Sequence, residues 1–179
     1  MIPLHDEEFA IAMIEEIERT FLMKILPPGL KGCKSVEIVD IYIPGSAEHP
    51  KIRIRRSGDK FELTKKEPIG QDASHQTEHT IPLTKEEFEE LSRLNGKKLS
   101  KIRYYYTCNG NVAEIDVFQE DLKGLILADF EFKTREERDS FKPPDFCIAD
   151  ITQEEFIAGG RLCGKSYEDI GKDLERFGI

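Results

Sequence analysis

Charged residues recur at every second position in several segments of the chain, and the two members of each pair have the same sign. The acidic pairs are Glu16 with Glu18, Glu114 with Asp116, and Asp129 with Glu131. The basic pairs are Arg53 with Arg55 and Lys101 with Arg103. Successive side chains of a β-strand point to opposite faces, so each pair would share one face. Clustered carboxylates can bind hard divalent cations, and clustered arginines and lysines can bind phosphates.

The residues that alternate with these charges are apolar, for example Ile52 and Ile54 around Arg53, and Phe130 between Asp129 and Glu131. An antiparallel sheet with one solvated face also alternates in this way. A solvated face usually mixes the two signs, however, whereas here two strands supply a basic pair and three supply an acidic pair. We therefore interpret the charges as the lining of a closed antiparallel barrel whose apolar outside is covered by helices.

The predicted lining contains more acids than bases. Its eight acids are Glu16, Glu18, Glu62, Glu78, Glu114, Asp116, Asp129 and Glu131, and its five bases are Arg53, Arg55, Lys66, Lys101 and Arg103. Unpaired buried charge is costly, so the acids require cations and the bases require a polyanion. A hard metal ion, Mg²⁺ or Mn²⁺, that bridges carboxylates and phosphate oxygens would offset the acidic excess.

Strand alternation also separates inner from outer charges. Lys66, and not Lys65, shares a face with Thr64, which places Lys66 inside the barrel. Arg19 and Arg56 have the opposite alternation, and we expect both at the outer surface.

The elements that must position these charges are eight strands and several short helices. The strands are expected near residues 14–22, 36–43, 51–57, 60–67, 76–82, 99–108, 111–118 and 125–133. Tight hairpins are expected at Ser57-Gly58-Asp59 and Asn109-Gly110. A Thr or Ser followed three residues later by an acid predicts helix starts at Thr84, Thr134, Thr152 and Ser166. The fold class is therefore α+β, with a single domain over residues 1–179.

Composition limits the classes of partner. The chain has 179 residues, with 26 Lys and Arg against 35 Asp and Glu and a net charge of -9, which argues against broad nucleic-acid or membrane binding. The N-terminus has neither the basic start nor the apolar stretch of a secretory signal, so a cytoplasmic location is expected. The four cysteines form no C-x-x-C pair. The oligomeric state is left open.

These segments resemble the CYTH domain family, also called triphosphate tunnel metalloenzymes. The family's mark is ExExK on the first barrel strand, and Glu16-Ile-Glu18-Arg-Thr20 resembles that motif with threonine in the last position. Five further motifs follow in the family's order: Ile52-Arg-Ile-Arg55, Leu63-Thr-Lys-Lys66, Lys101-Ile-Arg103-Tyr104, Ala113-Glu-Ile-Asp-Val-Phe118 and Leu127-Ala-Asp-Phe-Glu131.

The resemblance implies an eight-stranded antiparallel tunnel that binds a triphosphate with Mg²⁺ or Mn²⁺. Family members hydrolyse inorganic triphosphate, thiamine triphosphate, nucleoside triphosphates or RNA 5′-triphosphate ends, and one branch cyclises ATP. The leading hypothesis is a metal-dependent triphosphatase that acts on inorganic triphosphate or a small organic triphosphate. The alternatives are a class IV adenylyl cyclase, although the sequence specifies no adenine pocket, and a non-catalytic polyphosphate-binding module.

The expected roles follow from the same resemblance. Catalytic roles fall to Glu16, Glu18, Glu114 and Asp116; substrate binding to Arg53, Arg55, Lys66, Lys101 and Arg103; and metal binding to Glu16, Glu18, Asp129 and Glu131. Two positions depart from the family pattern. Thr20 stands in place of lysine, which removes a positive charge beside the metal, and Asp129 stands in place of the usual glutamate, which is one methylene longer.

Overall fold

The computed structural model describes residues 13–179, and its main strands follow the alternating segments. They are β1 (Met13–Met23), β2 (Ser35–Ile43), β3 (Ile52–Ser57), β4 (Lys60–Ile69), β5 (Asp72–Leu83), β6 (Lys97–Cys108), β7 (Asn111–Phe118) and β8 (Ile126–Phe132). All eight predicted strands are confirmed. A ninth, β9 (Cys147–Asp150), was not predicted because it has only four residues. The cytoplasmic location is expected from the N-terminal sequence, and residues 1–12 lie outside the described part of the chain.

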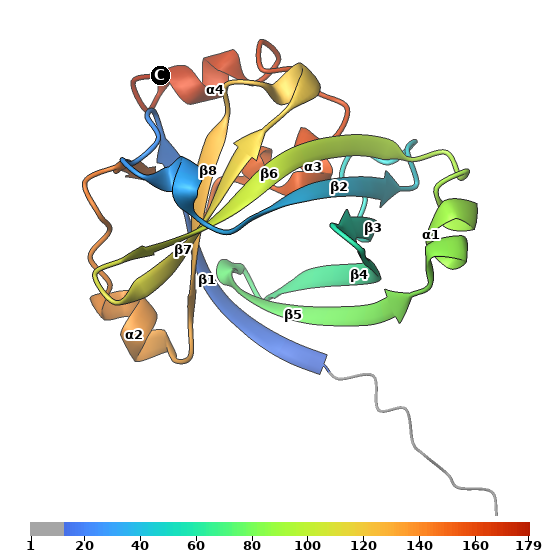
Figure 1. Ribbon diagram of the computed structural model, residues 1–179, viewed down its shortest axis with the longest axis horizontal. Coiled ribbons are helices and arrows are strands. Elements are labelled where there is room, and N and C mark those ends of the chain that lie inside the picture. The colour runs from blue at the N-terminus through green and yellow to red at the C-terminus, as the bar shows by residue number, and fades with distance from the viewer. Residues whose placement is uncertain (1–12) are drawn as a thin grey trace, which may run out of the picture.

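The strands close into the predicted antiparallel barrel. The sheet runs in the order β5-β4-β3-β2-β6-β7-β8-β1-β9, and an additional β5–β1 pairing joins its ends. β1 closes the barrel because residues 13–17 pair with β5, residues 17–22 pair with β8 and residues 21–23 pair with β9. The expected α+β fold with a closed eight-stranded barrel is confirmed, and β9 lies beyond the closing pair as an addition to it (Figure 1).

Both predicted hairpin turns are present. Asn109 and Gly110 have φ angles of 49° and 79°, as a two-residue turn with two left-handed positions requires. Gly58 has a φ angle of 58°, and the residues on either side of its turn, Ser57 and Lys60, are paired. These turns fix the registers that bring the inward charges of β3 opposite β4 and of β6 opposite β7.

The helices are short, and one of them, α3, borders the barrel interior. They are α1 (Lys85–Leu91), α2 (Arg135–Ser140), α3 (Gly159–Leu162) and α4 (Gly171–Glu175), with 3₁₀ turns at Leu30–Gly32, Glu120–Leu122 and Glu155–Ile157. Figure 1 shows α1 beside β3, β4 and β5, and the C-terminal helices on the side of β6 and β8. None of the helices in the described residues has the length and apolar character of a membrane span.

Two of the four predicted helix starts are confirmed. Thr84 forms a capping box with Glu87 before α1, and the side chain of Thr134 caps α2. The prediction at Thr152 is wrong, because its hydroxyl bonds to Asp150 and to the backbone of β1 instead. Ser166 makes capping-box bonds with Asp169, but the helix begins only at α4.

Apolar packing closes one end of the barrel interior. Leu22, Leu99, Phe118 and Leu127 are buried, and they continue the inward faces of strands that carry the charges. They pack against apolar residues of the C-terminal segment, namely Ile151, Ile157, Leu162, Ile170 and Leu174. The sequence after β8 therefore forms a floor for the charged interior, and this floor excludes water from its deep end.

Candidate active site

The barrel interior contains a cavity of about 570 Å³. All eight acids and five bases of the predicted lining border it: Glu16, Glu18, Glu62, Glu78, Glu114, Asp116, Asp129, Glu131, Arg53, Arg55, Lys66, Lys101 and Arg103. A cavity of this size is within the usual range for small-molecule sites. The structure thus brings together in one site charges from seven strands that are spread along the sequence.

The three charges expected at the outer surface do not border the cavity. Arg19 pairs with Asp150, Arg56 with Glu37, and Lys65 with Glu67. These outer pairs confirm the strand alternation that separated Lys66 from Lys65.

One side of the cavity, here called the basic wall, consists of Asp40, Arg53, Arg55, Lys101 and Arg103 from β2, β3 and β6. Its one carboxyl group belongs to Asp40, a residue that is 1% exposed. Arg55 donates from Nε and Nη2 to the two oxygens of Asp40 at 2.6 and 2.8 Å. Asp40 was missed in the sequence because it is a lone acid, although its inward alternation within residues 36–43 was a usable signal.

Asp40 is held in its charged form. Burial alone would raise the pKa of this carboxyl, but the guanidinium groups of Arg55 and Arg53 outweigh burial and hold the pKa well below its usual range. The paired charge in turn fixes the direction of the Arg55 side chain.

Arg103 links the basic wall to β7 and β8. Its guanidinium contacts Glu114, donates to both oxygens of Asp116 at 2.7 Å, and lies 3.4 Å from Asp129 Oδ2. Lys101 also pairs with Asp116. Burial would raise the pKa of Asp116, but Lys101 and Arg103 together lower it. Two of the acids predicted as catalytic, Glu114 and Asp116, are therefore engaged with a base in this structure.

The opposite side, here called the acidic wall, consists of Glu16, Glu18 and Thr20 on β1 and Asp129 and Glu131 on β8. Glu18 faces Glu131 and Thr20 faces Asp129 in the β1–β8 register. Burial and the neighbouring charges of Glu18 and Asp116 raise the pKa of Asp129 to about 6. Burial, together with Glu114 and Glu16, also raises the pKa of Glu131. Like charges on this wall repel one another.

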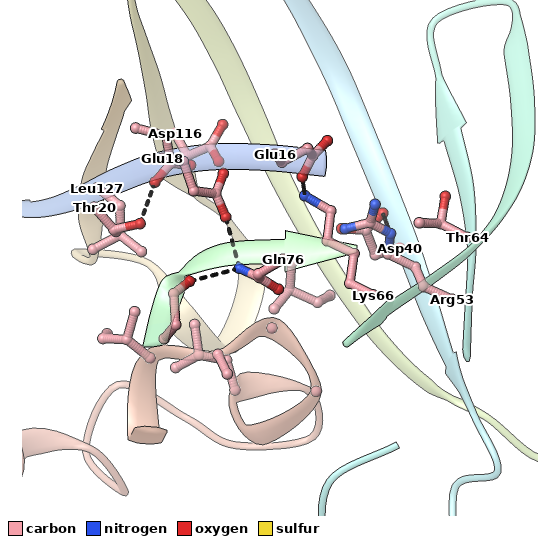
Figure 2. Close-up of a pocket in the computed structure, with 18 of the residues that line it drawn as sticks. Glu16, Glu18, Thr20, Asp40, Arg53, Thr64, Lys66, Gln76, Asp116 and Leu127 are labelled. Atoms are coloured by element: carbon pink, nitrogen blue, oxygen red, sulfur yellow. Dashed lines mark hydrogen bonds and ion pairs between the residues drawn. The ribbon is translucent and has the colours of Figure 1, made fainter. Parts of the chain in front are cut away.

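Two side chains from β4 and β5 reach the acidic wall. The ammonium of Lys66 contacts Glu16 and lies 3.1 Å from Glu78 Oε2. The amide of Gln76 donates to Glu18 Oε1 at 3.0 Å. Figure 2 shows Lys66 meeting Glu16 and Gln76 meeting Glu18, with Asp40 and Arg53 drawn at the right of the view, beside Lys66. Gln76 was not predicted, because its uncharged amide belongs to neither the acidic nor the basic pairs in the sequence.

Arg53 is the base with the weakest pairing in the cavity. Its Nε lies 3.8 Å from Asp40 Oδ1, which is beyond hydrogen-bond distance. Among the described residues, Nε of Arg53 is one of two buried side-chain polar atoms that lack a hydrogen-bond partner. Its side chain is 14% exposed. A buried donor without a partner is costly, so this guanidinium is available to an anionic ligand.

The carboxylates have the donor chemistry of a divalent-cation site. Within residues 13–179, no group of three or more His, Cys, Asp or Glu side chains is already arranged to hold a metal ion. The acidic wall nevertheless offers only oxygen donors that repel one another, which fits a hard cation. A cation would require these carboxylates to turn away from their present partners.

Comparisons with known proteins agree with this geometry. No family model matches the chain. The chain is 29% identical over 141 residues to an inorganic triphosphatase of Nitrosomonas europaea, a match that covers 78% of this chain and 90% of that protein. A crystal structure of the hypothetical protein NE1496 matches with a TM-score of 0.62 and 26% identity over 84% of this chain and 99% of that one.

A second crystal structure, of the inorganic triphosphatase NE1496, gives a TM-score of 0.61 at 24% identity. It covers 84% of this chain and 95% of that one, and it supports the barrel fold. The similarity to this inorganic triphosphatase and the shared barrel fold support the resemblance to the CYTH domain family. In this barrel, the inward positions of the motifs that resemble the family's coincide with the cavity lining, including the two positions that depart from the family pattern.

Proposed function

We propose that this protein is a member of the CYTH domain family and a metal-dependent triphosphatase that hydrolyses inorganic triphosphate or a small organic triphosphate. The observation that carries the proposal is the convergence of five bases from β3, β4 and β6 on one cavity of about 570 Å³, opposite an excess of carboxylates. The similarity to a protein named inorganic triphosphatase supports the same reaction class. The proposal includes a small-molecule partner rather than a nucleic acid. It also includes the expected cytoplasmic location.

The basic side chains bind the phosphates in this proposal. Arg53 already has a buried donor without a partner, and Arg55 is oriented by Asp40. Lys66, Lys101 and Arg103 exchange a carboxylate for a phosphate oxygen when the substrate enters. Arginine forks and lysine point charges stabilise the charge that develops on the leaving diphosphate.

The acidic side chains hold the cation and the attacking water. Glu16, Glu18, Asp129 and Glu131 would hold Mg²⁺ or Mn²⁺. The cation, when bound, polarises a phosphoryl oxygen and offsets negative charge in the transition state. Glu114 and Asp116 are released from Arg103 when this base turns to the phosphates, and their carboxylates then orient the water or hold a second cation.

A phosphate-release panel tests this proposal. Purified protein is given inorganic triphosphate, thiamine triphosphate or ATP with Mg²⁺ or Mn²⁺, beside the variant Glu18→Gln. We expect phosphate release above the variant with at least inorganic triphosphate. Tight triphosphate binding without release above Glu18→Gln would instead identify a binding module. Cyclic AMP and pyrophosphate from ATP, in place of ADP and phosphate, would identify a cyclase.

A further inference from the structure

The two departures from the family pattern contact each other in the structure. Thr20 on β1 and Asp129 on β8 are direct partners in the antiparallel register. The hydroxyl of Thr20 donates to Asp129 Oδ1 at 2.7 Å. Figure 2 shows this bond from Thr20, on the same strand as Glu16 and Glu18. Changes that look independent in the sequence therefore form one hydrogen-bonded pair.

The position of Thr20 is fixed from the C-terminal side. Its backbone N–H donates to the Thr152 hydroxyl at 3.0 Å, and its carbonyl accepts from the N–H of Ile151 at 2.9 Å. A β-branched side chain has few χ1 rotamers on such a fixed backbone. The hydroxyl is consequently aimed at Asp129 by the structure around it.

Asp129 is held on its other side as well. Its Oδ2 lies 3.4 Å from Nη2 of Arg103, and its side chain is 18% exposed. Thr20 therefore directs one oxygen of Asp129, while the second oxygen faces Arg103 and the cavity. Carboxylates that bind a cation are usually oriented by a hydrogen bond of this kind.

A hydroxyl at position 20 supplies a donor without adding a charge. A lysine there would bring an ammonium close to Arg103, which already contacts Glu114, Asp116 and Asp129. The shorter carboxylate of Asp129 is within reach of the short hydroxyl, so both members of the pair are matched in length.

We propose that Thr20 is a positioning residue that orients Asp129 for cation binding, and that the Thr20–Asp129 pair replaces the lysine and glutamate of the family pattern as a unit. This inference rests on the proposed function, because it concerns the same cation site. Thr20 acts through Asp129 and does not itself bind the phosphates.

The test removes the hydroxyl while retaining the shape of the side chain. Thr20→Val and Thr20→Ala lack the donor, and Thr20→Ser retains it. Thr77→Val is the matched control, since the Thr77 hydroxyl bonds to the Glu67 carbonyl and does not border the cavity. The affinity for Mn²⁺ alone is measured by calorimetry, and kcat and KM are measured with inorganic triphosphate. Circular dichroism and melting temperature verify that each variant is folded.

We expect Thr20→Val and Thr20→Ala to weaken Mn²⁺ binding by roughly 10- to 100-fold, as is typical when the partner of a ligating carboxylate is lost. In these variants kcat falls with little change in KM, Thr20→Ser recovers most of the loss, and Thr77→Val matches the wild type. Unchanged Mn²⁺ affinity in both hydroxyl-free variants, or a wild type that binds no Mn²⁺, overturns the inference. A wild type that binds Mn²⁺ but releases no phosphate overturns the proposed function alone.

Discussion

The two walls of the cavity place carboxylates in opposite electrostatic environments. On the basic wall, Asp40 is 1% exposed and paired with Arg55, and its pKa is held well below the usual range. On the acidic wall, burial and like charges raise the pKa of Asp129 to about 6 and also raise that of Glu131. A carboxylate on the basic wall therefore stabilises the fold, whereas the acidic wall retains charges that repel one another, as the proposed cation site requires.

Removal of a carboxylate from the acidic wall should produce the largest effect on activity. Glu18→Gln removes a charge that faces Glu131 across the β1–β8 pairing. We expect kcat to fall roughly a thousandfold, about 4 kcal/mol, because cation stabilisation of the transferred phosphoryl group is lost. Phosphate release with Mn²⁺ measures this change.

The same variant should not lower stability, because it relieves repulsion on the acidic wall. Melting temperature measures this second effect. Glu67→Gln is the control, since Glu67 pairs with Lys65 outside the cavity. A large loss of stability in Glu18→Gln would contradict the distinction between the walls.

Removal of the carboxylate from the basic wall should have its largest effect on stability. Asp40→Asn leaves Arg55 and Arg53 without a counter-charge in a buried position. We expect the free energy of unfolding to fall by about 3 kcal/mol at pH 7, as is typical for one broken buried pair. Urea unfolding of both proteins measures the difference.

The pH dependence of this difference follows from the lowered pKa of Asp40. A depressed folded-state pKa stabilises the fold above the pKa of the unfolded carboxyl, about 3.9, and this contribution is lost at lower pH. The difference between wild type and Asp40→Asn should thus narrow as the pH falls below about 4. Glu37→Gln on the same strand breaks only the exposed pair with Arg56 and should cost less than about 1 kcal/mol. An equal loss in both variants would mean that the basic wall does not depend on Asp40.

Within the basic wall, substitution of Arg53 should mainly affect substrate binding, whereas substitution of Arg55 should also affect stability. Nε of Arg53 has no partner, whereas Arg55 holds Asp40 with two hydrogen bonds. We expect Arg53→Met to raise the KM for inorganic triphosphate roughly thirtyfold, about 2 kcal/mol, with only a small fall in melting temperature, because Arg55 still pairs with Asp40. Arg55→Met should lower the melting temperature as well, because it leaves Asp40 unpaired. Equal melting temperatures in the two variants would refute this assignment.

Strand alternation is the reason that the fold and most of the lining could be predicted. Side chains in a strand alternate with a period of two, so Arg53 and Arg55, or Glu114 and Asp116, could be placed on one face without knowledge of strand pairing. Their sorted signs then indicated a closed interior. The outer placement of Arg19 and Lys65 followed from the same period.

Cross-strand partners could not be predicted, because they depend on register and on segments far apart in the chain. Asp40 gains its importance only from Arg55 on the next strand, and Gln76 only from Glu18 on β1. Thr152 resembles a helix cap in the sequence, but the backbone of Thr20 takes its hydroxyl instead. Local signals predicted the elements, whereas the pairing of β2 with β3 and of β1 with β5 and β9 determined these contacts.

The smallest expected effect concerns the family residues at positions 20 and 129. Thr20→Lys alone should lower kcat severalfold, because it replaces the donor to Asp129 with an ammonium close to Arg103. Adding Asp129→Glu restores the longer carboxylate opposite that lysine. If the two substitutions acted independently, the kcat of the double variant would equal the product of the two single effects. We expect its kcat to be roughly fivefold higher than that product, about 1 kcal/mol of coupling, as is typical of residues in contact. A double-mutant cycle on kcat measures this coupling. Additive effects would show that positions 20 and 129 act independently, whereas coupling would show that the acidic wall can exchange one length-matched pair for another.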